Sequence, residues 1–276
     1  MFPEQVVSGQ IEKEKTRWEN IKVFRVRHGN TPYNEQLKGI PDKDTIDLTE
    51  QGIEEIKNAA KNISSRLDKE NDIVCIINSP RKRTNDSAQI IKEYLIAEGF
   101  NIWEDQKGRQ EQYRVRSTDI LDSNLKPISH DELEYAPAFR ELLSKIKQVV
   151  PAGTSATKYW KEGGINDLEA PADVDKRSKN QLALLMRIAR TIQPKVDKHI
   201  AIIELEHEET LDDLLTRATD GEAGLKRDSG PKTGEVFELG ISTNSNKITV
   251  KSLNRDFETK SLNFNYLKRD FENESN

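Results

Sequence analysis

In the first hundred residues, short runs of hydrophobic residues alternate with segments in which hydrophobic residues recur every three or four positions. The run at 23–26 contains strong strand formers, and a glycine, an asparagine and a proline within 29–32 end it. Hydrophobic residues three or four apart then make one stripe, which predicts an amphipathic helix over about 50–67. Thr49 is placed to cap that helix.

The same order repeats directly afterwards. Residues 73–77 are all apolar, which is typical of a strand buried on both faces. A second stripe predicts a helix from about 83 to 98. Two strand and helix units in succession favour a mostly parallel sheet with right-handed crossovers, in a three-layer α/β/α fold.

The second half of the chain returns to this pattern after a less regular middle part. We interpret 102–175 as an insertion or cap over one end of the sheet. Within it we expect a third strand at 115–121 and short helices around 136–150 and 157–160. The later elements expected are a helix after 175 that Pro194 closes, a strand at 200–203, a helix near 211–218, and an edge hairpin of 234–239 and 247–250.

The predicted elements divide the chain into three parts. Residues 1–20 mix charged and polar residues with little periodicity, and we treat them as an N-terminal extension. Residues 21–253 form one domain, which contains the insertion at 102–175. Residues 254–276 are a charged C-terminal tail that we expect to be frayed.

Net charge, cysteine content and the length of the apolar runs argue against several classes of protein. A net charge of −5 argues against a general nucleic-acid binder, which normally presents a basic face. Cys75 is the only cysteine and lies in an apolar run, so we expect no disulfide framework, no thiolate metal cluster and a reducing compartment. No apolar run approaches the ~20 residues that span a bilayer. We therefore expect a soluble cytoplasmic protein with no membrane partner.

Polar residues gather where the predicted strands end. Arg27 and His28 follow the first strand, the second leads into 79–83, the third ends at Asp122, and a later one ends near His207. Because the carboxyl ends of parallel strands share one edge of a sheet, these residues are expected to face one pocket. Arginines suit phosphate oxygens and an imidazole is a nucleophile, so the set indicates phosphoryl transfer through a phosphohistidine, without metal or other cofactor.

Several motifs in the same order resemble the histidine phosphatase superfamily, also called phosphoglycerate-mutase-like. The likeness spans about 21–252. Its first motif is Arg-His-Gly-x-Thr-x-x-Asn at 27–34. The others are Leu-Thr-x-x-Gly at 48–52, Ser-x-x-x-Arg at 79–83 followed by Ser-Ala at 87–88, the late histidine His207, and the hairpin start at 234–237.

The resemblance implies a role for each matching residue. His28 would be the nucleophile, and Arg27, Arg83 and His207 would hold the phosphoryl oxygens. Nearby guanidinium charges disfavour a protonated His28 and so keep its attacking nitrogen free. Gly29 lets the backbone approach closely, and its carbonyl would fix the tautomer of His28. The implied substrate-binding residues are Gly29, Thr31, Asn34 and Ser79.

The general acid departs from the family pattern. In the mutase-like branch a glutamate after the third strand protonates the leaving oxygen, and this chain has Asp122 instead. A rival is Glu208 directly after His207, because the acid-phosphatase branch places an aspartate after its late histidine. The alternative interpretation of Glu208 is a solvated charge at the start of a helix. We interpret the whole acidic run 204–213 as a solvated face.

These observations favour hydrolysis of a phosphomonoester through a phosphohistidine on His28. A hydrolase is preferred to a mutase because the chain lacks the glutamate- and arginine-rich segment of true phosphoglycerate mutases. The expected partner is a phosphorylated small molecule or a phosphoprotein. Two alternatives are a catalytically weak or inactive member that binds a phosphorylated ligand or protein, and a phosphohistidine-specific protein phosphatase.

Overall fold

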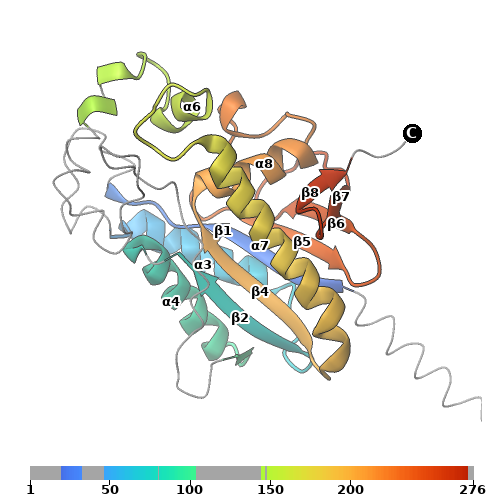
Figure 1. The fold of residues 1–276 in the computed structure, drawn as a ribbon. Helices are drawn as coiled ribbons and strands as arrows, with labels where there is room; N and C mark the ends of the chain where they lie inside the picture. Colours follow the sequence, from blue (N-terminus) through green and yellow to red (C-terminus); the bar gives the residue numbers. More distant parts are fainter. Residues whose placement is uncertain (1–19, 33–46, 80, 104–143, 147, 273–276) are drawn as a thin grey trace, which may run out of the picture.

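One mixed sheet forms the centre of the protein (Figure 1). The computed structural model describes residues 20–32, 47–79, 81–103, 144–146 and 148–272. The strand order across the sheet is β3-β2-β4-β1-β5-β6-β7-β8. The strands are β1 (Asn20–Arg27), β2 (Asp72–Asn78), β3 (Asn101–Ile102), β4 (His199–Glu206), β5 (Val236–Ser242), β6 (Lys247–Ser252), β7 (Leu262–Asn265) and β8 (Asp270–Glu272).

The first half of the sheet is parallel and the second half is antiparallel. β1 pairs with β4, β4 with β2 and β2 with β3, all in parallel. From β5 onward each strand runs antiparallel to its neighbour. The expected parallel strand and helix units are therefore confirmed, and β1 lies inside the sheet between β4 and β5.

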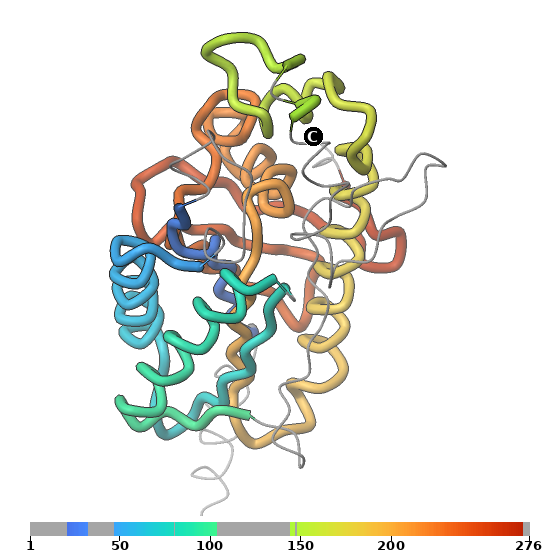
Figure 2. Tube along the Cα trace, turned by 90° about the vertical axis from the view of Figure 1, so that its left-hand side faces the viewer, coloured from blue at the N-terminus to red at the C-terminus, as the bar shows by residue number. Residues whose placement is uncertain are grey.

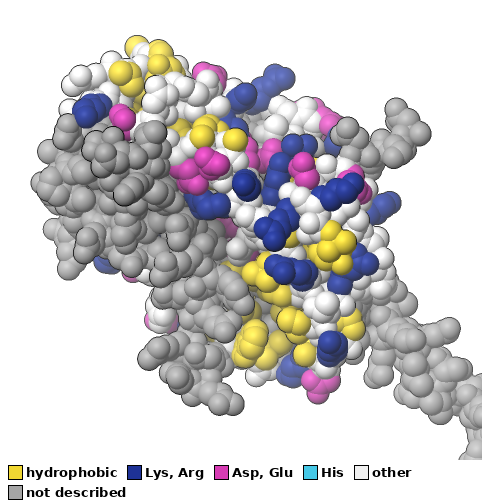
Figure 3. Space-filling view, viewed as in Figure 1, with side chains coloured by type: hydrophobic (Ala, Val, Ile, Leu, Met, Phe, Trp, Pro, Cys, Tyr) yellow, Lys and Arg dark blue, Asp and Glu magenta, His cyan; other side chains and the backbone are white. Residues whose placement is uncertain are grey.

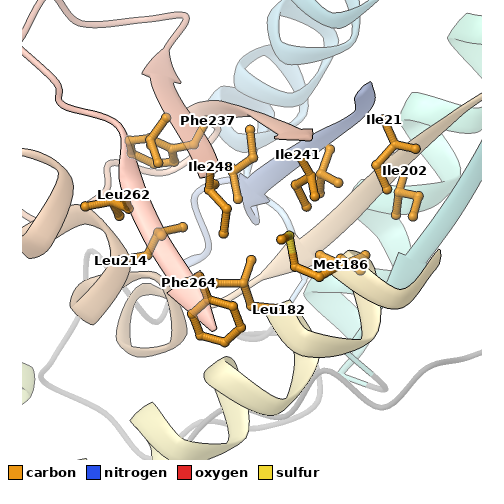
Figure 4. Packing of buried hydrophobic residues seen from close by; sticks show 14 of the residues in the cluster. Ile21, Leu182, Met186, Ile202, Leu214, Phe237, Ile241, Ile248, Leu262 and Phe264 are labelled. Atoms are coloured by element: carbon orange, nitrogen blue, oxygen red, sulfur yellow. The ribbon is translucent and has the colours of Figure 1, made fainter. Parts of the chain in front are cut away.

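Helices cover both faces of the sheet, as a three-layer fold requires (Figure 2). α3 (Glu50–Ser64) and α4 (Lys82–Ala97) share one apolar cluster with β1, β2 and β4. α7 (Pro171–Thr191) and α8 (Glu208–Ala218) pack on the opposite face. Figure 4 shows this second cluster, in which Leu182 and Met186 of α7 lie against Ile241, Ile248 and Phe264 from the antiparallel strands.

The contact between the start of α3 and the loop after β1 positions the residues that follow β1. Thr49 caps α3 as expected, because its hydroxyl accepts the Gly52 N–H at 3.0 Å. A Cβ on Gly29 would lie 2.4 Å from the carbonyl oxygen of Gly52, and one on Gly52 would lie 2.1 Å from that of Asn30. The two backbones approach as closely as glycine alone permits.

One expectation about the strands needs correction, and another is not tested. The strand expected at 115–121 lies outside the described residues, and the structure adds the short parallel strand β3 directly after α4. The expectation of a frayed tail is wrong for 262–272, because β7 and β8 extend the sheet beyond the hairpin. Leu262 and Phe264 are buried and alternate with asparagines, and this four-residue alternation is the strand signal in that segment.

The described part of the middle region forms a small cluster of its own. α6 (Ala156–Lys161) lies beyond the end of the sheet where β4 ends (Figure 1). Trp160 of α6 is buried with Val174 of α7 and Leu225 of the short helix η4 (Leu225–Arg227). Lys161 bridges Asp212 at 2.7 Å and Asp175 at 3.1 Å. These contacts fasten α6 to the start of α7 and to α8.

The surface in the view of Figure 1 is mixed in character. Lys and Arg side chains gather over α7 and α8, and hydrophobic side chains reach the surface where β2 and β4 lie beside α7 (Figure 3). Ile73 and Cys75 of β2 are half-buried there. None of the described helices has both the length and the apolar composition that a membrane crossing needs.

Replacing Gly52 by alanine should separate α3 from the loop after β1. The new methyl group would meet backbone atoms of Asn30, which cannot turn away as a side chain can. We expect the free energy of unfolding to fall by about 2 kcal/mol or more, measured by urea denaturation. Asn58→Ala, at an exposed position on the same helix, should change it by less than about 0.5 kcal/mol. Equal stabilities for the two variants would contradict the close contact.

Candidate active site

His28 follows β1 directly, and its ring is held in one orientation. Its backbone N–H donates to the Glu206 carbonyl at 3.2 Å, which ties the residue to the end of β4. Its Nδ1 lies 2.8 Å from the carbonyl oxygen of Gly29. Because a carbonyl only accepts, Nδ1 carries the proton and Nε2 carries the lone pair. His28 is 4% exposed, so its nucleophilic nitrogen is presented from a largely buried ring.

His207 follows β4 and lies beside His28. The ring centroids are 5.3 Å apart in an edge-on arrangement. Nε2 of His207 lies 2.9 Å from the hydroxyl of Ser79, which follows β2. The three parallel strands β1, β2 and β4 therefore each deliver one site residue to the same edge of the sheet.

Arg83 joins the two histidines. It occupies the first turn of α4, and its Nε donates to Nε2 of His28 at 3.1 Å. Its Nη2 lies 3.4 Å from Nδ1 of His207. One guanidinium thus spans both rings, and its planar fork is suited to oxygens of a tetrahedral anion placed between them.

The loop after His28 is fixed by side chains of α3 and α4. Ser87 of α4 accepts the Gly29 N–H at 3.3 Å and donates to the Arg83 carbonyl at 2.7 Å. Glu55 of α3 accepts the Asn30 N–H at 2.9 Å. Thr31 is fully buried, and its hydroxyl has no hydrogen-bond partner among the described residues.

Arg27 is paired with a carboxylate. Its Nη2 lies 2.7 Å from Oε2 of Glu208, the first residue of α8, and its Nη1 donates to the carbonyl of Pro231. The Glu208 side chain is 23% exposed, and burial raises its pKa although the charge of Arg27 lowers it. Glu208 is therefore part of the site and not the solvated helix-start charge that the sequence suggested.

Burial and positive charge keep His28 neutral. The pKa of its imidazole lies well below the ordinary value of 6.5, chiefly because the ring is buried and also because Arg83, Arg27 and Arg81 add positive charge. The hydrogen bond to Gly29 opposes this shift only in part. The lone pair on Nε2 is thus available at neutral pH, as a nucleophile requires.

The structure brings most of the predicted site residues together. Those at the shared edge of the sheet are Arg27, His28, Gly29, Thr31, Ser79, Arg83 and His207. Asn34 and Asp122 lie outside the described residues. Lys82 lies 2.8 Å from both Asp47 and Asp86, so its charge is already matched by two carboxylates. Sequence reasoning noted Ser87 only as part of a motif and missed Glu55. The contacts of both with the loop are tertiary, and neighbouring residues give no signal of them.

Removing the charge of Arg83 should raise the pKa of His28. We expect Arg83→Gln to move the titration of the His28 ring upward, towards 6.5, because a neighbouring cation is lost. Histidine ring resonances measured by NMR against pH would report this, and the chain has only four histidines to assign. Arg66→Gln, which removes an exposed guanidinium elsewhere, should leave the titration unchanged. A wild-type His28 that titrates near 6.5 would contradict the electrostatic interpretation.

Comparisons with known proteins agree with this geometry. Residues 23–106 match the family model described as histidine phosphatase superfamily (branch 1). This segment contains His28, its loop, Ser79 and Arg83. No curated protein matches the sequence.

Solved structures extend the likeness beyond that segment. Phosphoglycerate mutase from Bacillus anthracis str. Sterne has a TM-score of 0.52 at 14% identity, over 86% of this chain and 94% of that chain. A mycobacterial glucosyl-3-phosphoglycerate phosphatase, in a structure with VO3, has a TM-score of 0.50 at 16% identity, over 86% of this chain and 100% of that chain. The family model thus matches residues 23–106, and the solved structures show that the fold of the chain is phosphoglycerate-mutase-like.

Proposed function

We propose that the protein is a metal-independent phosphatase that hydrolyses a phosphomonoester through a phosphohistidine on His28. The observation that supports this best is the state of the His28 ring. Nδ1 is held by the Gly29 carbonyl, and Nε2 accepts a hydrogen bond from Arg83 at 3.1 Å. A neutral imidazole of fixed tautomer beside a guanidinium is suited to attack on a phosphoryl group.

In the first step, Nε2 of His28 attacks phosphorus, the bond from phosphorus to the ester oxygen breaks, and a carboxyl group donates its proton to the leaving oxygen. The donors of Arg83 and His207, which now contact ring nitrogens or Ser79, turn to the phosphoryl oxygens. Arg27 releases Glu208 and binds another oxygen. Positive charge in a buried site lowers the energy of the transferring group more than it would in water.

In the second step, water attacks the phosphohistidine and the bond between phosphorus and nitrogen breaks. Inorganic phosphate leaves, and His28 regains its neutral form. Dividing the displacement into two steps replaces one hard reaction with two easier ones. The same carboxyl group that protonated the leaving oxygen would take the proton from this water.

Two carboxyl groups compete for the role of general acid. Asp122 has the place in the sequence that the mutase-like branch implies. Glu208 lies 2.7 Å from Arg27 and has a raised pKa because it is largely buried. A bound phosphoryl group would add negative charge beside Glu208 and raise its pKa further, which favours proton uptake on substrate binding. We therefore propose Glu208 as a candidate of equal standing with Asp122.

The substrate we propose is a phosphorylated small molecule, and the location is the cytoplasm. The glucosyl-3-phosphoglycerate phosphatase that shares this fold is named for such a substrate. A single cysteine fits a reducing compartment.

A second candidate function is binding of a phosphorylated ligand without turnover. The ion pair between Arg27 and Glu208 favours it, because a carboxylate on Arg27 competes with the phosphoryl group.

Hydrolysis of p-nitrophenyl phosphate should depend on His28 and not on added metal. With a chelator present we expect turnover by the wild type and loss of at least about 10³-fold in His28→Ala, because no covalent intermediate forms. His199→Asn removes a buried histidine paired with Asp72 at the opposite end of β4, and should keep turnover per folded molecule. A folded but inactive wild type would contradict the hydrolase and favour the binding protein.

Comparison of an alkyl phosphate with an aryl phosphate should identify the acid. Loss of the acid slows the alkyl ester most, since its leaving oxygen needs the proton. If Glu208 has the role, Glu208→Gln should lower kcat on the alkyl ester by roughly 10²-fold or more and spare the aryl ester, whereas Asp122→Asn should leave both rates unchanged. The opposite pattern would assign the role to Asp122. Equal loss on both esters in Glu208→Gln would indicate that Glu208 acts through Arg27 instead.

A further inference from the structure

Three charged side chains are completely enclosed behind the two histidines. Arg25 of β1 and Glu204 and Glu206 of β4 are 1%, 0% and 1% exposed. Nε of Arg25 lies 2.7 Å from Oε2 of Glu204 and 3.4 Å from Oε1 of Glu206. We call these three residues the buried triad. They overturn the interpretation of 204–213 as a solvated face, since the acidic run begins inside the protein.

Neutral side chains from two helices complete the triad. Gln181 of α7 donates to Oε1 of Glu204 at 2.9 Å, and the hydroxyl of Thr210 of α8 lies 3.0 Å from Oε2 of Glu206. Ser178 of α7 accepts from Arg25 at 3.5 Å. The triad therefore connects the central strands β1 and β4 to both helices on that face of the sheet.

Charge balance requires one proton on the two carboxyl groups. One guanidinium neutralises one carboxylate, and a second buried carboxylate would be left without compensation at a large cost in free energy. The stable form is one in which the pair shares a proton and the triad is neutral.

The triad is joined to the active site through Glu206 and Thr210. The backbone carbonyl of Glu206 accepts the N–H of His28. The hydroxyl of Thr210 lies 3.0 Å from Oε2 of Glu206 and 2.8 Å from the carbonyl of His207, and it has one proton to donate. When Glu206 is protonated it donates to the Thr210 oxygen, which leaves the Thr210 proton for the His207 carbonyl. When Glu206 is ionised, Thr210 donates to Glu206 instead.

We propose that Glu206 is a positioning residue for the reaction at His28, whose shared proton keeps the buried triad neutral and holds His207 in place. Above the pH at which this proton is lost, the two carboxylates repel each other, and Thr210 turns its proton from the His207 carbonyl to the ionised Glu206. The inference rests on the proposed function, and it assigns the alkaline limit of that reaction to Glu206.

The surroundings of Glu206 support this assignment. Burial raises its pKa to about 8, Glu204 acts in the same direction, and Arg25 and Thr210 act in the opposite direction. Arg25 is the charged group that faces it from β1 and Glu204 the one from β4, while the contacts from α7 and α8 are uncharged. His28 cannot produce an alkaline limit, because its pKa is shifted downward.

Glu206→Gln tests the proposal in the enzyme assay. The amide mimics the protonated form, since its NH₂ in the place of Oε2 donates to the Thr210 hydroxyl and its oxygen in the place of Oε1 faces Nε of Arg25, but it cannot ionise. We expect kcat/KM on p-nitrophenyl phosphate within about twofold of the wild type at pH 6.5, and an alkaline decline that moves upward by at least about one pH unit. Glu258→Gln, at an exposed position, should keep the wild-type profile. An unchanged decline in Glu206→Gln would overturn the proposal.

Two substitutions of Thr210 distinguish the positioning of His207 from a general effect on protein stability. Thr210→Val removes the hydroxyl that joins Glu206 to His207 and keeps the shape of the side chain, whereas Thr210→Ser keeps the hydroxyl. We expect a loss of roughly tenfold or more in kcat for the valine variant, with near-normal kcat for the serine variant. Equal activity of both variants in the folded state would contradict the link to His207.

Thermal unfolding tests the shared proton even if the protein has no phosphatase activity. The unfolded chain loses the Glu206 proton near its ordinary pKa of 4.5, whereas the folded protein keeps it until about pH 8. The stability from this proton is complete below pH 4.5 and is lost as the pH rises towards 8. The wild-type Tm should therefore fall between pH 5 and 8 by several degrees more than that of Glu206→Gln. Parallel Tm profiles would overturn the shared proton.

Discussion

The parallel pairing of β1 with β4 is the constraint on which the site depends. Its register places Arg27 opposite Glu206, so His28 and His207 come next in line on adjacent strands. The N–H of His28 then continues the ladder onto the Glu206 carbonyl. A shift of this register by one residue would place the two histidines on opposite faces of the sheet, because side chains alternate along a strand. Helix α4 needs only to add Arg83 to a pair that the sheet has already formed.

Charge is distributed unevenly around this pair. On the side of α4 the site is positive, and the guanidinium of Arg83 touches both rings. On the side of α8 carboxyl groups oppose the cations, with Glu208 on Arg27 and Glu206 on Arg25. The positive side is suited to an anion, and the acidic side is suited to holding protons. Hydrolysis of a phosphomonoester needs both properties, at distances that the two strand ends fix.

Much of the site could be predicted from the sequence because its residues follow strands whose ends are marked. Arg27 and His28 stand before a glycine and a proline, and Ser79 stands before another proline, so their places in the fold followed from local signals. Glu204 and Glu206 were misread as solvated, although they continue an apolar run. Their partner Arg25 lies far away in the sequence, and no pattern within 204–213 reveals it. Pairing across a sheet is decided by tertiary structure and not by neighbouring residues.

The same pairing also affects when the site can form during folding. β1 lies near the beginning of the chain and pairs with Ala201 and its neighbours, so the contact closes a loop of most of the sequence. Contacts between such distant segments form slowly, and a growing chain cannot make them until β4 has been synthesised. Until then β1 lacks two neighbours, since β5 follows β4 in the chain. An incomplete chain would hold His28 on an unpaired strand, so this histidine acquires its environment only after β4 and β5 have been synthesised.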